Sequence, residues 1–342
     1  MDLESSKEVI AERKIIMERN ILRMYHIYKL FHPEIFQGKY RKKHYFEGWY
    51  FKIIDKNKEH ALAVIPGISL EKDSAHAFIQ VLDHNNNAYY FRYPITDFYF
   101  HPKKFEIKIG DNYFSKDKML LNLNEKNGSI RGRLDFSGRI EFPKTPLRPG
   151  IMGPYSFVPF MECYHGIVTV HHEINGRLAL SGKTVDFTGG YGYVEKDWGR
   201  SFPEYWIWFQ SNHFTGRDAT IMFSVAKIPW FFGAFTGFIS FLRYKERVIV
   251  FATYTGAKLR RLEYKGSRIR AVLSDPRFCL ELEARQADGG SLMAPKNGLM
   301  EQKIVESINA AVKVRLSDRR GNKIFEGTGT NAGLEVFGIK DI

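Results

Sequence analysis

The segment GGYGYVEKDWGRSFPEYWIWFQSNHF, residues 189–214, carries the side-chain alternation that decides the fold class. A β-strand turns successive side chains to opposite faces, so every second residue shares a face. That period places Tyr193, Glu195 and Asp197 on one face. Alternate residues lie roughly 6.5–7 Å apart along a strand, so the two acids can serve one site. After a proline, the same period predicts a second face of two indoles and two amides: Trp206, Trp208, Gln210 and Asn212.

A face that combines acids, indoles and amides suits a pocket for an apolar molecule with one reactive polar end. The alternative is an ordinary antiparallel sheet, in which the acids face water and the aromatic side chains fill the core. On composition alone, this simpler interpretation is slightly favoured.

Short alternating runs separated by turn residues extend on both sides of this segment, from residue 39 onward. YFEGWYFKIID (45–55) leads into KNKE, and AFIQVLD (77–83) leads into HNNN. TIMFSVAKI (220–228) and RVIVFATYT (247–255) repeat the pattern in the second half. Such spacing is typical of antiparallel all-β domains, either barrels or sandwiches. We therefore expect two β domains.

The stretch FPKTPLRPGIMGPYSFVPF (142–160) separates these halves. Prolines this dense exclude a central strand and predict a long structured loop near the domain boundary. At the other end, residues 5–31 predict a helix, because Ser5 and Glu8 can form a capping box and no Gly or Pro intervenes. We expect the helix to pack against the protein body; an interfacial helix on a membrane is the alternative. The predicted organisation is a helix and linker (1–37), a first β domain (38–185) and a second β domain (186–342).

Length and composition limit the class of protein. A chain of 342 residues fits two domains, and 44% hydrophobic with 26% charged residues describes a soluble globular protein. Two cysteines, Cys163 and Cys279, make no disulfide framework and favour a reducing compartment. The opening MDLESSKEVIAERK has no apolar segment of a signal peptide. We therefore expect a cytoplasmic location.

The net charge of +13 calls for an explanation. Nucleic acid is disfavoured as a partner, because the basic residues are spread along the chain and no nucleic-acid-binding motif occurs. Weak attraction to an anionic membrane surface would explain the charge and would make the protein peripheral on the inner membrane face. Solubility alone is the simplest explanation. The apolar run Ile228–Leu242 is too short to span a bilayer, so we expect buried strand and turn; a membrane-dipping loop is the alternative.

Common catalytic signatures are absent from the sequence. There is no P-loop, no GxGxxG after a strand, no GxSxG and no HExxH. The adjacent His171 and His172 would face opposite ways on a strand, which makes them poor joint metal ligands. We therefore expect no required metal, nucleotide or other cofactor.

Acids embedded among aromatic residues are the remaining chemical signal. Glu47 and Trp49 occur in YFEGWYF, and Glu162 and His165 occur in MECYHG. A carboxyl in such surroundings loses hydration, which raises its pKa and keeps it protonated near neutrality. A protonated acid can protonate a carbon–carbon double bond, and indole faces can stabilise the resulting cation. A structural hydrogen bond to a nearby turn is the commoner role for any one of these acids.

The chain resembles the tocopherol cyclase family from about Pro33 to Gly338. The resemblance rests on PEIFQGKYRKKHYFEGWYFKI, ECYHG, GYGYVEKDWGRSFPEYWIWFQSNHF, FATYTGAK, LMAPKNGLMEQKIVES and NAGLEVFG. It implies two lipocalin-like β domains side by side. It also implies cofactor-free cyclisation of a prenylated quinol to a chromanol, an intramolecular-lyase reaction of the isomerase class. In such a reaction an acid protonates the alkene, and the phenol oxygen closes on the tertiary cation.

The resemblance also suggests which residues form the site. We expect Asp197 to be the proton donor with Glu195 supporting it, and His165 is the reserve candidate. Asp197 could instead cap the WGRSFP turn. The expected substrate-binding residues are Tyr193, Trp198, Trp206, Trp208, Gln210, Asn212, Glu47, Trp49 and Glu162.

Three other functions stay open at the sequence level. An isoprenoid hydratase would use the same alkene protonation, and a non-catalytic isoprenoid- or lipid-binding protein would share the fold without a reactive acid. A glycan-active enzyme would also use paired carboxylates, but the apolar surroundings argue against a sugar.

Overall fold

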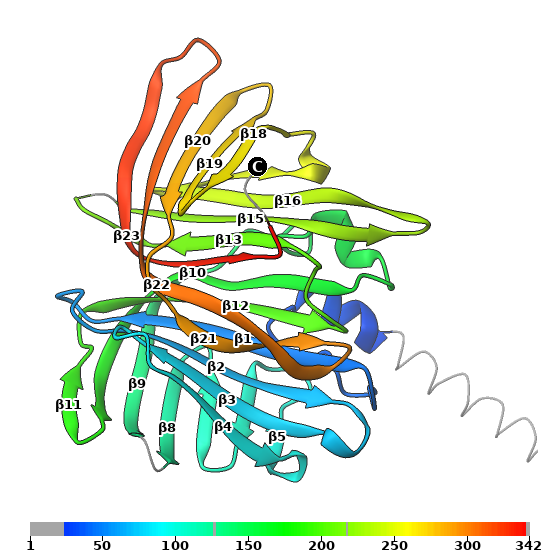
Figure 1. Ribbon diagram of the computed structural model, residues 1–342, viewed down its shortest axis with the longest axis vertical. Helices are drawn as coiled ribbons and strands as arrows, with labels where there is room; N and C mark the ends of the chain where they lie inside the picture. The colour runs from blue at the N-terminus through cyan, green and yellow to red at the C-terminus, as the bar shows by residue number, and fades with distance from the viewer. Residues whose placement is uncertain (1–23, 126–127, 217, 340–342) are drawn as a thin grey trace, which may run out of the picture.

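Two large antiparallel sheets account for most of the computed structural model, which describes residues 24–125, 128–216 and 218–339 (Figure 1). The first sheet has twelve strands. Their order is β4 (Ala88–Pro94), β3 (His76–Asp83), β2 (Ala61–Leu70), β1 (Tyr45–Ile54), β12 (Gly190–Gly199), β10 (Cys163–Leu180), β9 (Gly128–Ile140), β8 (Lys118–Glu125), β7 (Asn112–Ser115), β6 (Glu106–Ile109) and β5 (Phe98–Phe100), with β11 (Lys183–Asp186) paired to β10.

The second sheet has eleven strands. Their order is β17 (Arg247–Ala252), β16 (Gly233–Tyr244), β15 (Ala219–Trp230), β13 (Trp206–Ser211), β23 (Lys323–Phe337), β22 (Leu299–Asp318), β20 (Phe278–Arg285), β19 (Arg268–Ser274) and β18 (Lys258–Lys265), with β14 (His213–Phe214) paired to β23 and β21 (Gly290–Lys296) paired to β22. Four short 3-10 helices connect strands: η1 (Lys72–Ser74), η2 (Ile95–Asp97), η3 (Gly153–Phe157) and η4 (Thr253–Thr255).

Each sheet curls around a hydrophobic core of its own. Phe91 on β4 and Ile107 on β6, near opposite ends of the first sheet, belong to one buried cluster. Phe251 on β17 and Ile269 on β19 are joined in the same way in the second sheet. The sequence prediction of an all-β chain with two lipocalin-like antiparallel units is thus confirmed.

A third buried cluster fills the layer between the two sheets. On β13, Ile207 and Phe209 enter the second core, whereas Trp206 and Trp208 enter the layer between the sheets. The alternation predicted for this strand therefore sorts its side chains into two cores. Tyr193 on β12 enters the intersheet layer from the opposite side.

The hairpin of β21 and β22 ties the second sheet to the first (Figure 1). Gln80 on β3 bonds the backbone of Met293 in both directions: its Nε2 donates to the carbonyl oxygen at 2.9 Å, and its Oε1 accepts from the amide at 2.7 Å. Ser69 Oγ donates to the Gly298 carbonyl at 2.6 Å. Strand β22 then continues into the second sheet, where its far end pairs with β20.

The boundary between the sheets falls later than the predicted domain boundary at 185/186. Strand β12 lies in the first sheet, because β1 pairs with one of its edges and β10 with the other. The chain crosses to the second sheet in residues 200–205. The division into two domains stays a prediction.

The other predicted elements are found in part. The proline-rich stretch 142–160 is a loop that contains η3, as predicted, but it connects β9 and β10 within the first sheet. Residues 24–31 are helical, and the earlier part of the predicted helix lies outside the described residues. No helix in the described ranges combines the length and apolar character needed to cross a bilayer. The run Ile228–Leu242 forms the β15–β16 hairpin, as expected, but its tip is exposed rather than buried.

A fully buried ion pair fastens the segment before β1 to the first sheet. Lys196 Nζ lies 2.5 Å from Glu47 Oε1 and donates to the carbonyl oxygens of Pro33 at 2.8 Å and Ile35 at 2.5 Å. Glu47 also accepts hydrogen bonds from the backbone amides of residues 37 and 38. The pair thus satisfies buried polar groups that no water can reach.

Replacing Lys196 by Ala should lower the free energy of unfolding by about 3–5 kcal/mol, because the Glu47 carboxylate would stay buried without its counter-charge. Urea denaturation measures the change. Arg133→Ala is the control, since the Arg133–Asp135 pair is exposed and such pairs contribute about 0–1 kcal/mol. A loss as small as the control's would contradict the assignment.

Candidate functional site

A cavity of about 190 Å³ lies between the sheets, and most of its lining is apolar. Strands of both sheets contribute to it, as does the loop before β10. Its apolar walls include Phe46, Met152, Tyr155, Ile228 and Phe235. Polar groups enter this lining at only a few positions, which suits a ligand that is mostly hydrocarbon.

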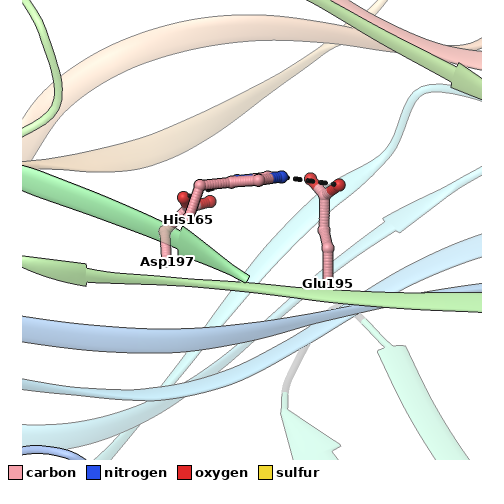
Figure 2. A group of neighbouring side chains, drawn as sticks. All are labelled: His165, Glu195 and Asp197. Atoms are coloured by element: carbon pink, nitrogen blue, oxygen red, sulfur yellow. Dashed lines mark hydrogen bonds and ion pairs between the residues drawn. The ribbon is translucent and has the colours of Figure 1, made fainter. Parts of the chain in front are cut away.

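Three titratable side chains meet on one wall of the cavity (Figure 2). His165 on β10 and Asp197 on β12 are direct cross-strand partners, and Glu195 lies two residues earlier on the same face of β12. His165 Nδ1 is 2.8 Å from Asp197 Oδ1, and Nε2 is 3.4 Å from Glu195 Oε2. Figure 2 shows the imidazole ring extending from β10 toward the Glu195 carboxylate. The ring therefore lies between two carboxylates.

This position fixes the charge of the imidazole. Burial alone would lower the pKa of His165, but the charges and hydrogen bonds of Asp197 and Glu195 outweigh burial and raise that pKa to about 10. The ring is therefore an imidazolium at neutral pH. The cluster therefore places a cationic ring against two carboxyl groups inside an apolar cavity.

Neighbouring groups hold the two carboxylates in place. Tyr193 donates its hydroxyl hydrogen to Glu195 Oε2 at 2.6 Å. Burial, followed by the Glu195 charge, raises the pKa of Tyr193 well above its ordinary range, so the hydroxyl stays a donor. Cys163 Sγ approaches Asp197 Oδ1 at 3.9 Å, a weak contact. Glu162 also lines the cavity, and it pairs with Arg200 at 3.2 Å.

Two indoles form part of the opposite wall. Trp206 and Trp208 both line the cavity from β13. Trp206 Nε1 donates to Glu335 Oε2 at 2.7 Å. Trp208 packs edge-on against Tyr50, with ring centroids 5.4 Å apart. Flat aromatic faces beside an acid cluster can stabilise a transient carbocation.

Two acids that the sequence analysis did not select lie on this side of the intersheet layer. Glu306 on β22 and Glu335 on β23 are cross-strand partners. Glu335 lines the cavity, whereas Glu306 is fully buried and accepts a hydrogen bond from Tyr50 at 2.5 Å. Both lie in segments that carried the family resemblance. Glu335 alternates with Leu334 and Val336 and looks like an outward-facing acid, whereas Glu306 shares the strand face of Ile304 and Ile308, a signal of burial that the sequence analysis did not use. Only the pairing of β22 with β23 reveals that they are neighbours.

Several predicted binding residues lie outside the cavity. Gln210 and Asn212 lie deeper in the intersheet layer: Gln210 accepts from Lys52 Nζ at 2.9 Å, and Asn212 donates to the Gly192 carbonyl at 2.9 Å. Burial lowers the pKa of Lys52 to about 7, although the nearby Glu306 and Glu195 charges oppose this.

Three others lie on the far face of the first sheet, away from the cavity. Glu47 belongs to the buried ion pair described above. Trp49 packs in the first core and donates to the Glu34 carbonyl at 2.8 Å. Trp198 stacks on Tyr164 with ring centroids 5.4 Å apart.

The acid cluster is also where a metal could bind in the described part of the chain. Ligand atoms of His165, Glu195 and Asp197 all lie within 4.8 Å of one another. In the observed arrangement His165 Nδ1 is 2.8 Å from Asp197 Oδ1, whereas Nε2 lies 3.4 Å from Glu195 Oε2 without a hydrogen bond of acceptable geometry. The expectation of metal-free chemistry stays a prediction.

Comparison with known proteins gives short but clear relationships. A 68-residue segment is 31% identical to "Probable tocopherol cyclase, chloroplastic" of Oryza sativa subsp. japonica, and it covers 20% of this chain and 14% of that protein. The same identity and coverage hold for "Tocopherol cyclase, chloroplastic" of Zea mays. The matched segment therefore spans about a seventh of the length of these relatives.

The fold is also found in a solved structure of low sequence identity. The crystal structure of CghA with Sch210972 has a TM-score of 0.51 and 10% identity, over 85% of this chain and 88% of that chain. Kievitone hydratase from Nectria haematococca has a TM-score of 0.48 and 11% identity, over 85% and 89% of the respective chains.

The family relationship itself covers most of the second half of the chain and part of the first. The model of the tocopherol cyclase-like family matches residues 136–338, more than half of the sequence. This range includes His165, Glu195, Asp197 and Glu335, which line the cavity, and Glu306, which lies behind it. The chain therefore belongs to the tocopherol cyclase-like family.

Proposed function

We propose that this protein cyclises a prenylated quinol or related isoprenoid inside the intersheet cavity, without a metal or nucleotide. One observation carries the proposal: an apolar cavity holds an imidazolium between two carboxylates and faces two indoles. An isoprenoid chain needs the apolar walls, and alkene protonation followed by ring closure needs both a proton donor and a proton acceptor.

The proposed reaction begins with transfer of a proton to the alkene, which leaves a tertiary carbocation. The faces of Trp206 and Trp208 and the negative charges of Glu195 and Asp197 would stabilise that cation. The phenol oxygen then attacks the cation and loses its proton. Asp197 was favoured from sequence as the donor; in the structure it shares a hydrogen bond with His165, so we assign the His165–Glu195–Asp197 cluster jointly to acid–base catalysis.

Two alternatives use the same cavity. A non-catalytic isoprenoid-binding protein needs the apolar walls but not the acid cluster. A hydratase needs the cluster but adds water instead of the phenol oxygen. The products distinguish these possibilities: a binding protein gives no product, a hydratase gives an alcohol and a cyclase gives a chromanol.

The purified protein should bind and cyclise members of a panel of prenylated quinols that differ in chain length, with a chelator present throughout. Calorimetry measures binding, and chromatography of the products measures conversion to chromanol. Failure to bind any member of the panel would refute the proposed ligand class. Activity that disappears with chelator and returns with an added divalent metal would refute the metal-free mechanism.

Asp197→Asn should lower the turnover number by about 100-fold or more, since general acid–base groups contribute roughly 10²–10⁴ in rate. The amide keeps the shape of the side chain but removes a charge and a proton site, so substrate affinity should change little. Asp135→Asn, an exposed substitution on β9, serves as control. Wild-type turnover by a folded Asp197→Asn protein would remove Asp197 from the mechanism.

The β15–β16 hairpin offers a location for the expected weak membrane contact. Phe231 is 74% exposed and Phe232 fully exposed at the tip of the β15–β16 hairpin, which projects from the second sheet (Figure 1). Phe160 packs against Phe231, with ring centroids 5.4 Å apart. Ile228 and Phe235, a cross-strand pair close to this tip, line the cavity. We therefore propose that this tip contacts the membrane from which an apolar substrate enters.

Replacing Phe231 and Phe232 together by Ser should weaken binding to anionic liposomes by about tenfold, because apolar area that would enter the membrane is lost. Sedimentation measures the bound fraction. Tyr99→Ser is the control, since Tyr99 is an exposed aromatic residue on β5 of the first sheet. Binding that falls with added salt but not with the double substitution would assign the contact to net charge alone.

A further inference from the structure

The carboxyl groups of Glu306 and Glu335 form a second acidic site beside the cavity. Their positions in β22 and β23 are directly opposite in register. Side chains opposite each other in an antiparallel pair lie on the same face, with Cβ atoms roughly 4.5–5.5 Å apart. Glu335 reaches the cavity, whereas Glu306 lies behind it with no exposed surface. The pair therefore has one accessible member and one enclosed member.

Each carboxyl is held by one neutral donor. Tyr50 donates to Glu306 Oε1 at 2.5 Å, and Trp206 donates to Glu335 Oε2 at 2.7 Å. Glu306 Oε2 has no hydrogen-bond partner of acceptable geometry among the described residues. Neither donor brings a positive charge, in contrast to the His165 cluster. Two carboxylates this close in a dry layer cannot both ionise, so the pair retains a proton.

The electrostatic surroundings favour the same conclusion. Removal from water raises the pKa of Glu335 to about 8; the Trp206 hydrogen bond opposes this, and the Asp197 and Glu195 charges reinforce it. Burial and the Glu335 charge raise the pKa of Glu306 well above its ordinary range, against the hydrogen bond from Tyr50 and the positive charge of Lys52. At neutral pH Glu335 is thus a carboxylic acid that faces the ligand space. The two groups titrate as a unit.

We propose that Glu335 is the acid that protonates the substrate alkene, and that Glu306 is a positioning residue that keeps Glu335 protonated. This assignment rests on the proposed function, and it gives that function its proton source. Glu335 lines the same cavity as Trp206, so the developing cation would lie beside an indole face.

The step is balanced as follows. The alkene π electrons form a C–H bond with the Glu335 proton, and the O–H electrons remain on the Glu335 carboxylate. A lone pair of the phenol oxygen forms the C–O bond with the tertiary cation. The phenolic proton passes to the carboxylates of Glu195 and Asp197 and from there to solvent. Glu335 regains a proton from solvent before the next turnover, so the reaction is a net isomerisation.

His165 is the weaker candidate for the first proton transfer. Its pKa of about 10 makes it a poorer acid than Glu335, whose pKa is about 8. The proton on Nδ1 is also engaged in the hydrogen bond to Asp197. The His165 cluster is therefore suited to stabilise the cation and accept the phenolic proton. Acid and base then occupy different walls of one cavity.

The test compares Glu335→Gln with Glu306→Gln, using the same panel of prenylated quinols. Glu335→Gln keeps an acceptor for Trp206 but has no proton to transfer, so turnover should fall by about 10²–10⁴-fold with little change in affinity. Glu306→Gln removes the carboxyl that keeps Glu335 protonated, so its kcat/KM should begin to fall at a lower pH than that of wild type, while its turnover at low pH should stay close to wild type. A folded Glu335→Gln protein with wild-type turnover would overturn the proposal.

The pH dependence supplies a readout that a merely structural role would not affect. Because the donor must carry its proton, wild-type kcat/KM should fall as the pH rises through about 8. Any residual kcat/KM of Glu335→Gln should not show this fall at high pH. The pH at which kcat/KM falls also depends on the other titratable groups around Glu335. These groups are Glu306 on β22, Glu195 and Asp197 on β12, Tyr50 and Lys52 on β1, and His165 on β10.

A measurement without substrate separates this proposal from the proposed function. Infrared difference spectra between about pH 6 and about pH 10 should show loss of a protonated carboxylic acid, and Glu335→Gln should abolish that signal. If wild-type protein converts no member of the panel, the proposed function fails, yet this signal still tests the protonation of Glu335. If the signal is absent in wild type, or persists in Glu335→Gln, the proposal about Glu335 fails.

Discussion

The structure depends on how polar side chains are satisfied in the layer between its two sheets. Neither sheet can turn that face to water, so groups from one sheet must bond groups from the other. Tyr50 on the first sheet donates to Glu306 on the second, and Lys52 donates to Gln210 in the same direction. Such bonds fix the relative position of the sheets. They also leave carboxyl groups in a layer without water, where the protonated form of an acid is favoured.

The strand period alone identified one wall of the cavity. Glu195 and Asp197 were predicted to share a face because strands alternate, and both line the cavity. The period does not say which core a face looks toward. Trp49 and Trp198 therefore seemed equivalent to Trp206 from sequence, yet they pack on the far side of the first sheet. Which face meets which core depends on sheet curvature, and that is set by the whole set of strands.

The second wall could not be found from local sequence. Glu306 and Glu335 belong to separate strands; Glu335 alternates with apolar residues as a surface acid does, whereas Glu306 lies in phase with Ile304 and Ile308. Their proximity is a property of the β22–β23 register, which has shifts along its length and cannot be counted from a turn. The fold class needed only the repeated short runs, whereas the acid pair needed the long-range pairing. This explains why the fold was predictable and half of the site was not.

Strand β22 has a consequence for how the molecule comes apart. Its first residues pair with β21, which is bonded to side chains of the first sheet, and its last residues pair with β20 inside the second. This twenty-residue strand crosses from one sheet to the other without interruption, although its register against β23 shifts between Ser307 and Val312. Loss of either core would disturb that register and separate Glu306 from Glu335. The juxtaposition of the two acids therefore depends on both cores at once.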